Sequence, residues 1–294
     1  MHRPHLDSRL PGIACLLVTA TGWAINWPAM KLLLQVWPPL FSRGLAGVIA
    51  AVVLVAIAAL QGQRLIPERQ ALPRLTAAAF TNVFAWMGFS TLAMKWINVS
   101  EGVLLVYTMP IWVTLLAWPL RGIRPTASGF AALLLGLAGV TVLLSAHGLS
   151  IAPGQALGVG FALAAAVLFA LGTVLNGGPF PLAPIVSTAW QVGLGCLPML
   201  VFGIAFEHPR LDALGPGPLA CMVYMTFVPM GVCYLTWFAA LQRLPASVAA
   251  TGMLLVPLLG VLSAAVMLGD AIGAREILAM TLTLSGVALV LKRR

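Results

Sequence analysis

Long apolar runs alternate with short interruptions of Pro, Gly or charged residues along the chain. A helix of about 20 apolar residues is long enough to cross the hydrocarbon core of a bilayer. The pattern predicts an all-α integral membrane protein, and the short gaps leave no room for a soluble domain. The ten predicted transmembrane helices are residues 12–34, 38–60, 73–95, 99–120, 126–146, 154–175, 184–206, 216–241, 246–268 and 272–291.

The composition agrees with a protein that lies in lipid. Hydrophobic residues make up 61% of the chain, charged residues only 8%, and the mean hydropathy is +1.03. A soluble domain is typically about a quarter charged, so this chain has too few charges to cover a soluble surface. The partner implied is the lipid bilayer. The net charge of +9 does not indicate a nucleic-acid partner, because the basic residues are spread over short loops.

The distribution of basic residues predicts the orientation. With a cytoplasmic N-terminus, eleven basic residues fall in inside loops and tails and four at outside ends. The positive-inside rule therefore puts both termini in the cytoplasm. The inside group is Arg3, Arg9, Arg64, Arg69, Arg74, Arg121, Arg124, Arg243, Lys292, Arg293 and Arg294. The outside group is Lys31, Lys95, Arg210 and Arg275, and Lys31 is expected to extend to the outer interface.

The chain also contains an internal repeat. When it is shifted by 147 residues, residues 93–147 and 240–294 share thirteen identities without a gap, including Pro110 with Pro257 and Gly122 with Gly269. Each half, 1–147 and 148–294, holds five predicted spans, and an odd number inverts the second half in the membrane. Two inverted five-helix repeats around a central cavity are typical of secondary transporters that work by alternating access.

The first predicted span carries unusual residues for a lipid-facing helix. Within Gly22–Lys31 it holds Trp23, Asn26, Trp27 and Pro28. Pro28 removes a backbone donor, and freed carbonyl groups at membrane depth are tolerated only against protein or a wet cavity. This span is therefore expected to face a polar cavity. Asn26 either presents its amide to a substrate or bonds a neighbouring helix.

Other polar and aromatic residues lie inside predicted spans and are candidates for the same cavity. Arg43, in the second span, either attracts a substrate carboxylate or braces a helix end. Deep aromatic rings offer surfaces on which a flat side chain stacks, whereas Trp237 is interpreted as a membrane-interface anchor. The candidate substrate-binding residues are Trp23, Asn26, Trp27, Arg43, Asn82, Trp86, Tyr107, Trp112, Trp190, Gln191 and Tyr234. Pro28, Pro110 and Pro257 are candidate hinges.

Acidic residues are absent from the predicted midplane, since all seven fall at or near span ends. Proton-coupled carriers usually place a titratable group there. The pattern favours an uncoupled carrier of zwitterions or neutral metabolites, unless Glu101 or Asp270 faces a water-filled vestibule. No catalytic or metal-ligand motif appears, so we expect no enzyme activity, no metal and no cofactor. A channel remains an alternative class.

Several motifs together resemble the EamA family of the drug/metabolite transporter superfamily. Trp23, Asn26, Trp27 and Lys31 are similar to its W-G-x-N-F-x-x-x-K pattern, with Ala24 in place of the glycine. The segments from Trp96 and from Leu241 look like its paired proline-containing segments. The segment from Leu268 looks like its closing motif, with Asp270 for the glutamate and Ile123 at the equivalent position of the first half.

The resemblance covers essentially the whole chain and implies a function. It implies an exporter of aromatic and other neutral amino acids, or similar small metabolites, in the bacterial inner membrane. The sequence leaves the oligomeric state open, and we take a monomer as the working state. The alternative is a proton-coupled exporter of nucleotide sugars, phosphorylated metabolites or xenobiotics. In this family the cavity is lined mainly by helices other than five and ten. Those two spans are expected to form scaffold, with Gly136, Gly139 and Gly286 allowing close packing.

Overall fold

The structure, a computed structural model, describes residues 6–124, 127–144, 153–176, 180–210, 212, 214–244, 248–249 and 252–291. Its secondary structure in these ranges is helical, and each predicted span overlaps one helix or a run of helices, with α13 covering only 255–268 of the span predicted at 246–268. The helices are α1 (Leu6–Leu33), α2 (Pro39–Leu60), η1 (Arg69–Ala71), α3 (Leu72–Ala79), η2 (Phe80–Phe89), α4 (Ser90–Ala93), α5 (Val99–Val106), α6 (Met109–Arg121), α7 (Ala127–Leu144), α8 (Pro153–Leu175), α9 (Pro184–Phe202), η4 (Gly203–Glu207), α10 (Pro216–Phe227), η6 (Val228–Val232), α11 (Cys233–Arg243), α13 (Leu255–Leu268) and α14 (Ala274–Leu291).

Length and hydropathy make this an integral membrane protein, as the sequence predicts. In the described part of the chain, seven helical segments are long and apolar enough to cross a membrane, and two shorter apolar helices, Gly129–Val142 and Leu255–Leu268, accompany them. The seven are Leu10–Leu33, Pro39–Leu60, Arg69–Ala93, Val99–Arg121, Gly154–Leu175, Pro184–Glu207 and Pro216–Arg243.

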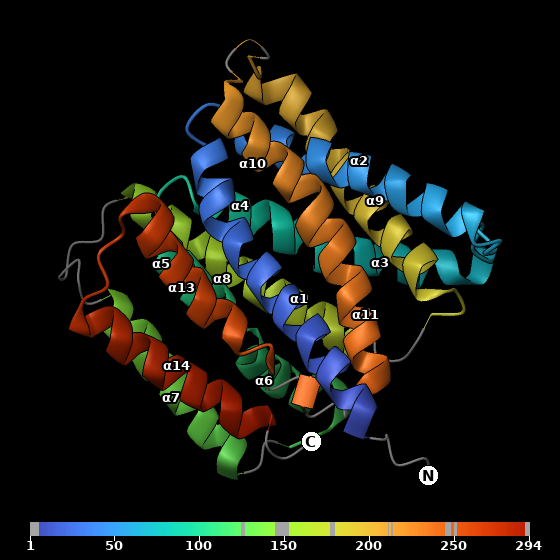
Figure 1. Ribbon diagram of the computed structural model, residues 1–294. Coiled ribbons are helices and arrows are strands. Elements are labelled where there is room, and N and C mark those ends of the chain that lie inside the picture. The colour runs from blue at the N-terminus through green and yellow to red at the C-terminus, as the bar shows by residue number, and fades with distance from the viewer. Residues whose placement is uncertain are drawn as a thin grey trace.

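The helices form a bundle around α1 (Figure 1). α1 packs against α13 and α11, α2 packs against α9, and α7 packs against α14 at the edge of the bundle. α8 packs against η2 and α6. The first turn of α1 and the last turn of α14 lie at the same end of the bundle, which we call the terminal end; the opposite end is the distal end (Figure 1). Arg3, Lys292, Arg293 and Arg294, which contribute to the predicted orientation, lie outside the described residues.

Several spans are interrupted near their middle. The third and eighth contain the π-helical segments η2 and η6, in which the wider turn redirects side chains. The fourth span breaks at Tyr107 and Thr108, between α5 and α6. α6 and α13 both end at a glycine in the left-handed conformation, Gly122 with φ 69° and Gly269 with φ 73°.

Small residues let α7 and α14 approach closely, as predicted. A Cβ atom added to Gly286 would lie 2.8 Å from the carbonyl oxygen of Ala132, and one added to Gly139 would lie 2.9 Å from that of Ala279. Gly136 faces Ile111 of α6 instead. Any larger side chain at Gly139 or Gly286 would push the two helices apart.

A packed apolar core closes the distal end. Met30, Leu33, Met94, Ile97 and Val103 belong to one cluster and are each at most 3% exposed. The loops above this core are tied down by hydrogen bonds. The Glu207 carboxylate accepts from the Leu40 and Phe41 N–H groups at 3.2 and 2.8 Å, and the Trp37 indole donates to the Arg210 carbonyl oxygen at 2.9 Å.

Lys31, which is expected to extend to the outer interface, is bonded to the protein at the distal end. It is half-buried, and its ammonium group donates to the carbonyl oxygens of Met94 and of Ile97, the latter at 3.0 Å. These carbonyls follow the end of α4, where no further helical N–H group can reach them. Lys31 therefore joins α1 to the α4–α5 loop.

Candidate functional site

A cavity of about 570 Å³ lies inside the bundle, within the size range of small-molecule binding sites. Its lining comes from both halves of the chain and is mostly aromatic or apolar. The lining residues are Trp23, Asn26, Trp27, Met30, Arg43, Asn82, Trp86, Met87, Ser90, Tyr107, Met109, Pro110, Phe169, Thr173, Pro229, Met230, Tyr234, Trp237, Met253, Leu254, Pro257, Leu284 and Val287.

One face of α1 forms a wall of this pocket, as the sequence predicts for the first span. Trp23, Asn26, Trp27 and Met30 follow the i, i+3, i+4, i+7 spacing that places side chains on one face of a helix. Pro28 is buried outside the pocket, and α1 runs unbroken through it. At Pro28, one of the candidate hinges, α1 therefore continues as one helix.

Aromatic rings form a connected row along the pocket. Trp86 contacts Phe169 and Tyr107 with ring centroids 4.7 and 6.1 Å apart, and Tyr107 contacts Trp27 at 6.3 Å. Tilted and edge-on contacts of this kind are favourable and fix the ring orientations. The row leaves ring faces and edges available to a flat, apolar ligand.

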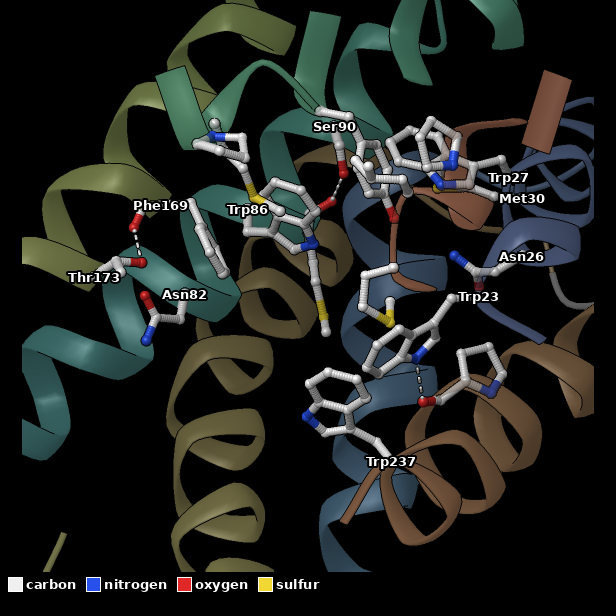
Figure 2. Close-up of a pocket in the computed structure, with 18 of the residues that line it drawn as sticks. Trp23, Asn26, Trp27, Met30, Asn82, Trp86, Ser90, Phe169, Thr173 and Trp237 are labelled. Carbon is white, nitrogen blue, oxygen red and sulfur yellow. Dashed lines mark hydrogen bonds between the residues drawn. The ribbon is translucent and has the colours of Figure 1, made fainter. Parts of the chain in front are cut away.

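A second aromatic group lies on α1 and α11. Trp23 meets Tyr234 edge-on with centroids 5.6 Å apart and Trp237 at 6.1 Å. The Trp23 indole N–H donates to the Pro229 carbonyl oxygen at 2.9 Å, which locks the ring in place. Figure 2 shows this hydrogen bond, with Trp237 beside it in the pocket.

Neutral polar groups lie on the side of the pocket opposite Asn26 (Figure 2). Asn82 on η2 accepts a hydrogen bond from Thr81 at 3.3 Å, and Thr173 on α8 donates to the Phe169 carbonyl oxygen at 2.9 Å. Thr173 lies two residues before the end of α8 and is exposed. Asn82 and Thr173 supply hydrogen-bonding capacity without charge.

Arg43 is the charged residue among the described pocket-lining residues. It lies on α2 and is 5% exposed, and its Nη1 reaches the Asn26 Oδ1 at 3.4 Å. The Nε atom is buried and has no hydrogen-bond partner. A guanidinium group carries five N–H donors and is normally paired when buried, so this environment is unusual.

Three predicted binding residues lie outside the pocket. Trp112 donates to the Thr108 hydroxyl of its own helix at 3.1 Å, and Gln191 donates to the Ser187 hydroxyl one turn away at 3.1 Å. Trp190 donates to the carbonyl oxygen of Leu65, in the loop after α2, at 2.8 Å. These residues were chosen because they lie deep within their predicted spans. Whether a residue lines the pocket depends instead on which face of its helix carries the side chain.

Other pocket residues were missed or assigned differently. Trp237 lines the pocket and was wrongly interpreted as a membrane anchor. Leu284 and Val287 come from α14, so this helix contributes to the wall as well as to the scaffold. Phe169 and Thr173 share a face of α8 by their i, i+4 spacing, which is the signal that a search for polar residues in apolar runs overlooked. The methionines Met30, Met87, Met109, Met230 and Met253 add flexible apolar lining.

Acidic side chains lie away from the pocket in the described part of the chain. Glu101 closes a capping box with Asn98 at the start of α5, and Glu207 caps α2. Asp270 is in the α13–α14 loop near Lys31. Burial raises the pKa of the Asp270 carboxyl group, and the Lys31 ammonium group and the Val99 N–H act to lower it.

A metal site is not apparent in the described residues, where no three His, Cys, Asp or Glu side chains gather. A membrane-embedded helical bundle with an aromatic pocket between its helices is compatible with a small-molecule carrier. Residues 10–145 and 156–292 each match the EamA-like transporter family. The chain therefore belongs to this family, whose members are transporters and not enzymes.

Relatives of known sequence agree with this assignment. The chain is 26% identical over 266 residues to the uncharacterized transporter YoaV of Bacillus subtilis, covering 90% of this chain and 91% of YoaV. It is 24% identical to a probable terminal-alkyne amino-acid exporter of Streptantibioticus cattleyicolor, covering 95% and 92%. It is 26% identical to a probable amino-acid metabolite efflux pump of Salmonella typhimurium, covering 95% and 94%. A protein of known crystal structure shares the fold, with a TM-score of 0.61, 24% identity and 96% of both chains covered.

Proposed function

We propose that this EamA-family transporter exports aromatic and other neutral amino acids, or similar small metabolites, across the bacterial inner membrane by alternating access. The observation that carries this proposal is the pocket of about 570 Å³, lined, among the residues that the structure describes, by aromatic rings and one charged residue, Arg43. A site of this size and lining suits a small molecule with a flat apolar side chain. The names of two relatives, an amino-acid exporter and an amino-acid metabolite efflux pump, point to the same substrate class.

We further propose that ten membrane helices form two inverted repeats, residues 1–147 and 148–294. The double family match supports this division, as do the left-handed glycines 122 and 269, which are 147 positions apart. The packing also supports it: α2 and α9, and α7 and α14, are repeat equivalents that pack on each other. The α1–α13 contact has its equivalent in α8–α6, and α1–α11 in α8–η2.

Alternating access needs points where the helices bend. Pro110 and Pro257 lie at equivalent places near the starts of α6 and α13, each following a turn, and both line the pocket. We assign them the hinge role. The packed distal core and the exposed Thr173 near the terminal end support a conformation that is closed distally. With both termini cytoplasmic, this is an inward-facing conformation.

The carrier is proposed to be uncoupled, because the acidic side chains that the structure describes lie outside the pocket. Proton coupling is the alternative, and Asp270 is the group to test, since burial raises its pKa. Its place at the distal end, beside Lys31, suits a role in closure better than proton carriage. The proposal treats the monomer as the transporting unit.

Counterflow in liposomes tests this function. The full chain is reconstituted in vesicles loaded with unlabelled phenylalanine, and the entry of labelled phenylalanine is measured with and without a pH gradient. We expect saturable exchange whose rate is the same with and without the pH gradient. In Trp86→Ala the exchange rate should fall about tenfold or more. The matched control Trp118→Ala, 53% exposed on α6, should retain it. Flux that requires the gradient would contradict the uncoupled carrier, unsaturable flux would indicate a channel, and no flux of any amino acid would contradict the substrate class.

A further inference from the structure

The pocket has an unusual charge balance. Arg43 is the cationic residue among its described lining residues, and none of those residues is Asp or Glu. The acids described elsewhere are committed to other groups or lie in loops: Glu207 caps α2 and Glu276 accepts from Arg275 at 2.7 Å. The described part of the chain therefore supplies one positive charge to the pocket and no negative charge to balance it.

The Arg43 guanidinium group is buried but lacks most of the hydrogen-bond partners that it could have. It is 5% exposed, and its one hydrogen bond, from Nη1 to the neutral Asn26 Oδ1, is long at 3.4 Å. Its Nε atom is buried and unpaired. Cys196 and Tyr234 are the groups that interact with it electrostatically, and neither carries a negative charge in its ordinary protonation state. A buried cation of this kind is stabilised by any ligand that brings an anionic oxygen.

We propose that Arg43 binds the carboxylate of the substrate, and that this carboxylate, not an ammonium group, is what the pocket recognises. The planar edge of a guanidinium group, Nε with one Nη, matches the two oxygens of a carboxylate. Because the pocket offers an ammonium group no acidic partner, aromatic monocarboxylates without an amine are substrates alongside amino acids. This inference rests on the proposed function, since it requires that the pocket carries a small molecule.

The charge balance of the pocket also excludes other classes of ligand. A phosphate monoester carries nearly two negative charges near neutral pH, and one guanidinium group would leave the surplus unpaired in an apolar cavity. An organic cation would meet Arg43 without an acid to offset it. One carboxylate neutralises Arg43, so the favoured ligand carries one carboxylate and an apolar body.

The position of Arg43 orients that ligand. The Arg43–Asn26 contact places the carboxylate site beside the α1 face that carries Trp23 and Trp27. The aromatic row from Trp27 through Tyr107 and Trp86 to Phe169 then leads away across the pocket. Asn82 and Thr173, on the opposite side in Figure 2, suit a neutral polar substituent at the far end of the ligand.

Competition between three molecules of matched shape tests the inference on the unmodified protein. Labelled phenylalanine counterflow is inhibited with unlabelled phenylalanine, with 3-phenylpropionate, which lacks the amine, and with 2-phenylethylamine, which lacks the carboxylate. We expect 3-phenylpropionate to compete within about fivefold of phenylalanine, because only neutral hydrogen bonds to the amine are lost. We expect 2-phenylethylamine to compete about 30-fold more weakly or worse. Equal competition by the amine, or failure of the acid to compete, would overturn the inference.

Arg43→Gln and direct binding separate this inference from the proposed function. In Arg43→Gln, 3-phenylpropionate and 2-phenylethylamine should inhibit phenylalanine counterflow equally. The control is Lys95→Met, which changes an exposed lysine over the Trp96 ring and should keep the preference for the acid. If the wild-type protein carries no flux but still binds 3-phenylpropionate in an Arg43-dependent manner, the proposed function fails and the inference stands. If phenylalanine exchanges normally and Arg43→Gln leaves the preference unchanged, the function stands and the inference fails.

Discussion

Lys31 and Arg43 are two cations buried to different degrees on helices α1 and α2, which follow each other in the chain, and their surroundings differ in kind. Lys31 donates to the carbonyl oxygens of Met94 and Ile97 and interacts electrostatically with Asp270 and Glu101. Arg43 is more deeply buried and has one long contact to a neutral amide. The protein provides hydrogen-bond and charge partners for Lys31 and leaves Arg43 without a charged partner. We infer that Lys31 fixes structure and that Arg43 is kept for a ligand.

The largest expected effect is on substrate affinity in Arg43→Gln. Loss of the charge-assisted contact should weaken phenylalanine binding about 30-fold or more, because a buried partner of an ion pair is removed. Thermal stability should hold or rise, since an unpaired buried charge is also removed. Binding is measured by titration and stability by thermal melting in the same detergent. A large stability loss with unchanged affinity would give Arg43 the structural role.

The second effect concerns stability in Lys31→Met. Two carbonyl groups lose their donor, which should lower the free energy of unfolding by about 1–3 kcal/mol. Affinity for phenylalanine should change little, because Lys31 is not a pocket-lining residue. Melting curves compared with Lys95→Met, which alters an exposed lysine, provide the measurement. A selective loss of affinity in Lys31→Met would contradict the comparison.

The third prediction concerns a variant in which Arg43, like Lys31, has an acidic partner from the protein. Asn26→Asp puts a carboxylate where the amide oxygen lies 3.4 Å from Arg43 Nη1. The new ion pair should raise stability by about 1 kcal/mol and weaken phenylalanine binding about tenfold, because the protein's own carboxylate competes for Arg43. Asn82→Asp, on the opposite side of the pocket, should lower stability instead, as it adds a charge away from that cation. Equal behaviour of the two variants would show that Arg43 is not short of a partner.

The smallest effect is a pH dependence at the distal end. Burial raises the pKa of Asp270, so this carboxyl group contributes stability at low pH that is lost as the pH rises through its native pKa. The wild-type melting temperature should therefore contain a small decline that begins above the ordinary value of 3.8. Asp270→Asn should lack this component, and Lys31→Met should extend it to higher pH, because Lys31 lowers the Asp270 pKa. Identical pH profiles for all three proteins would contradict this account.

The sequence predicted helices well and side-chain direction less well. Length and hydropathy predict the positions of the helices that the structure describes, and the face of Trp23, Asn26 and Trp27 follows from polar residues at helical spacing. Trp190 shows the limit: its depth in the span is as expected, but its ring turns to the Leu65 carbonyl oxygen. The rotation of a helix about its axis is set by its neighbours, which a hydropathy pattern does not encode.

Long-range partners were the other missing information. Lys31 has carbonyl partners because α4 ends beside it, and the Met94 carbonyl group is 63 residues away in the sequence. Arg43 drew attention from the sequence because a charge within a membrane span is costly, yet two roles remained open. Its buried Nε atom has no hydrogen-bond partner, which is the observation behind the proposal that Arg43 binds a carboxylate. Phe169 was missed because an apolar residue in an apolar helix shows the direction it faces only through its neighbours, here the i, i+4 spacing to the polar Thr173.

The most direct test of the central claim is the acid-to-amine preference measured side by side in three proteins. Inhibition of phenylalanine counterflow by 3-phenylpropionate and by 2-phenylethylamine is compared in the wild type, Arg43→Gln and Lys31→Met. The account predicts a strong preference for the acid in the wild type and Lys31→Met, and no preference in Arg43→Gln. A preference that persists in Arg43→Gln, or disappears equally in Lys31→Met, would contradict it.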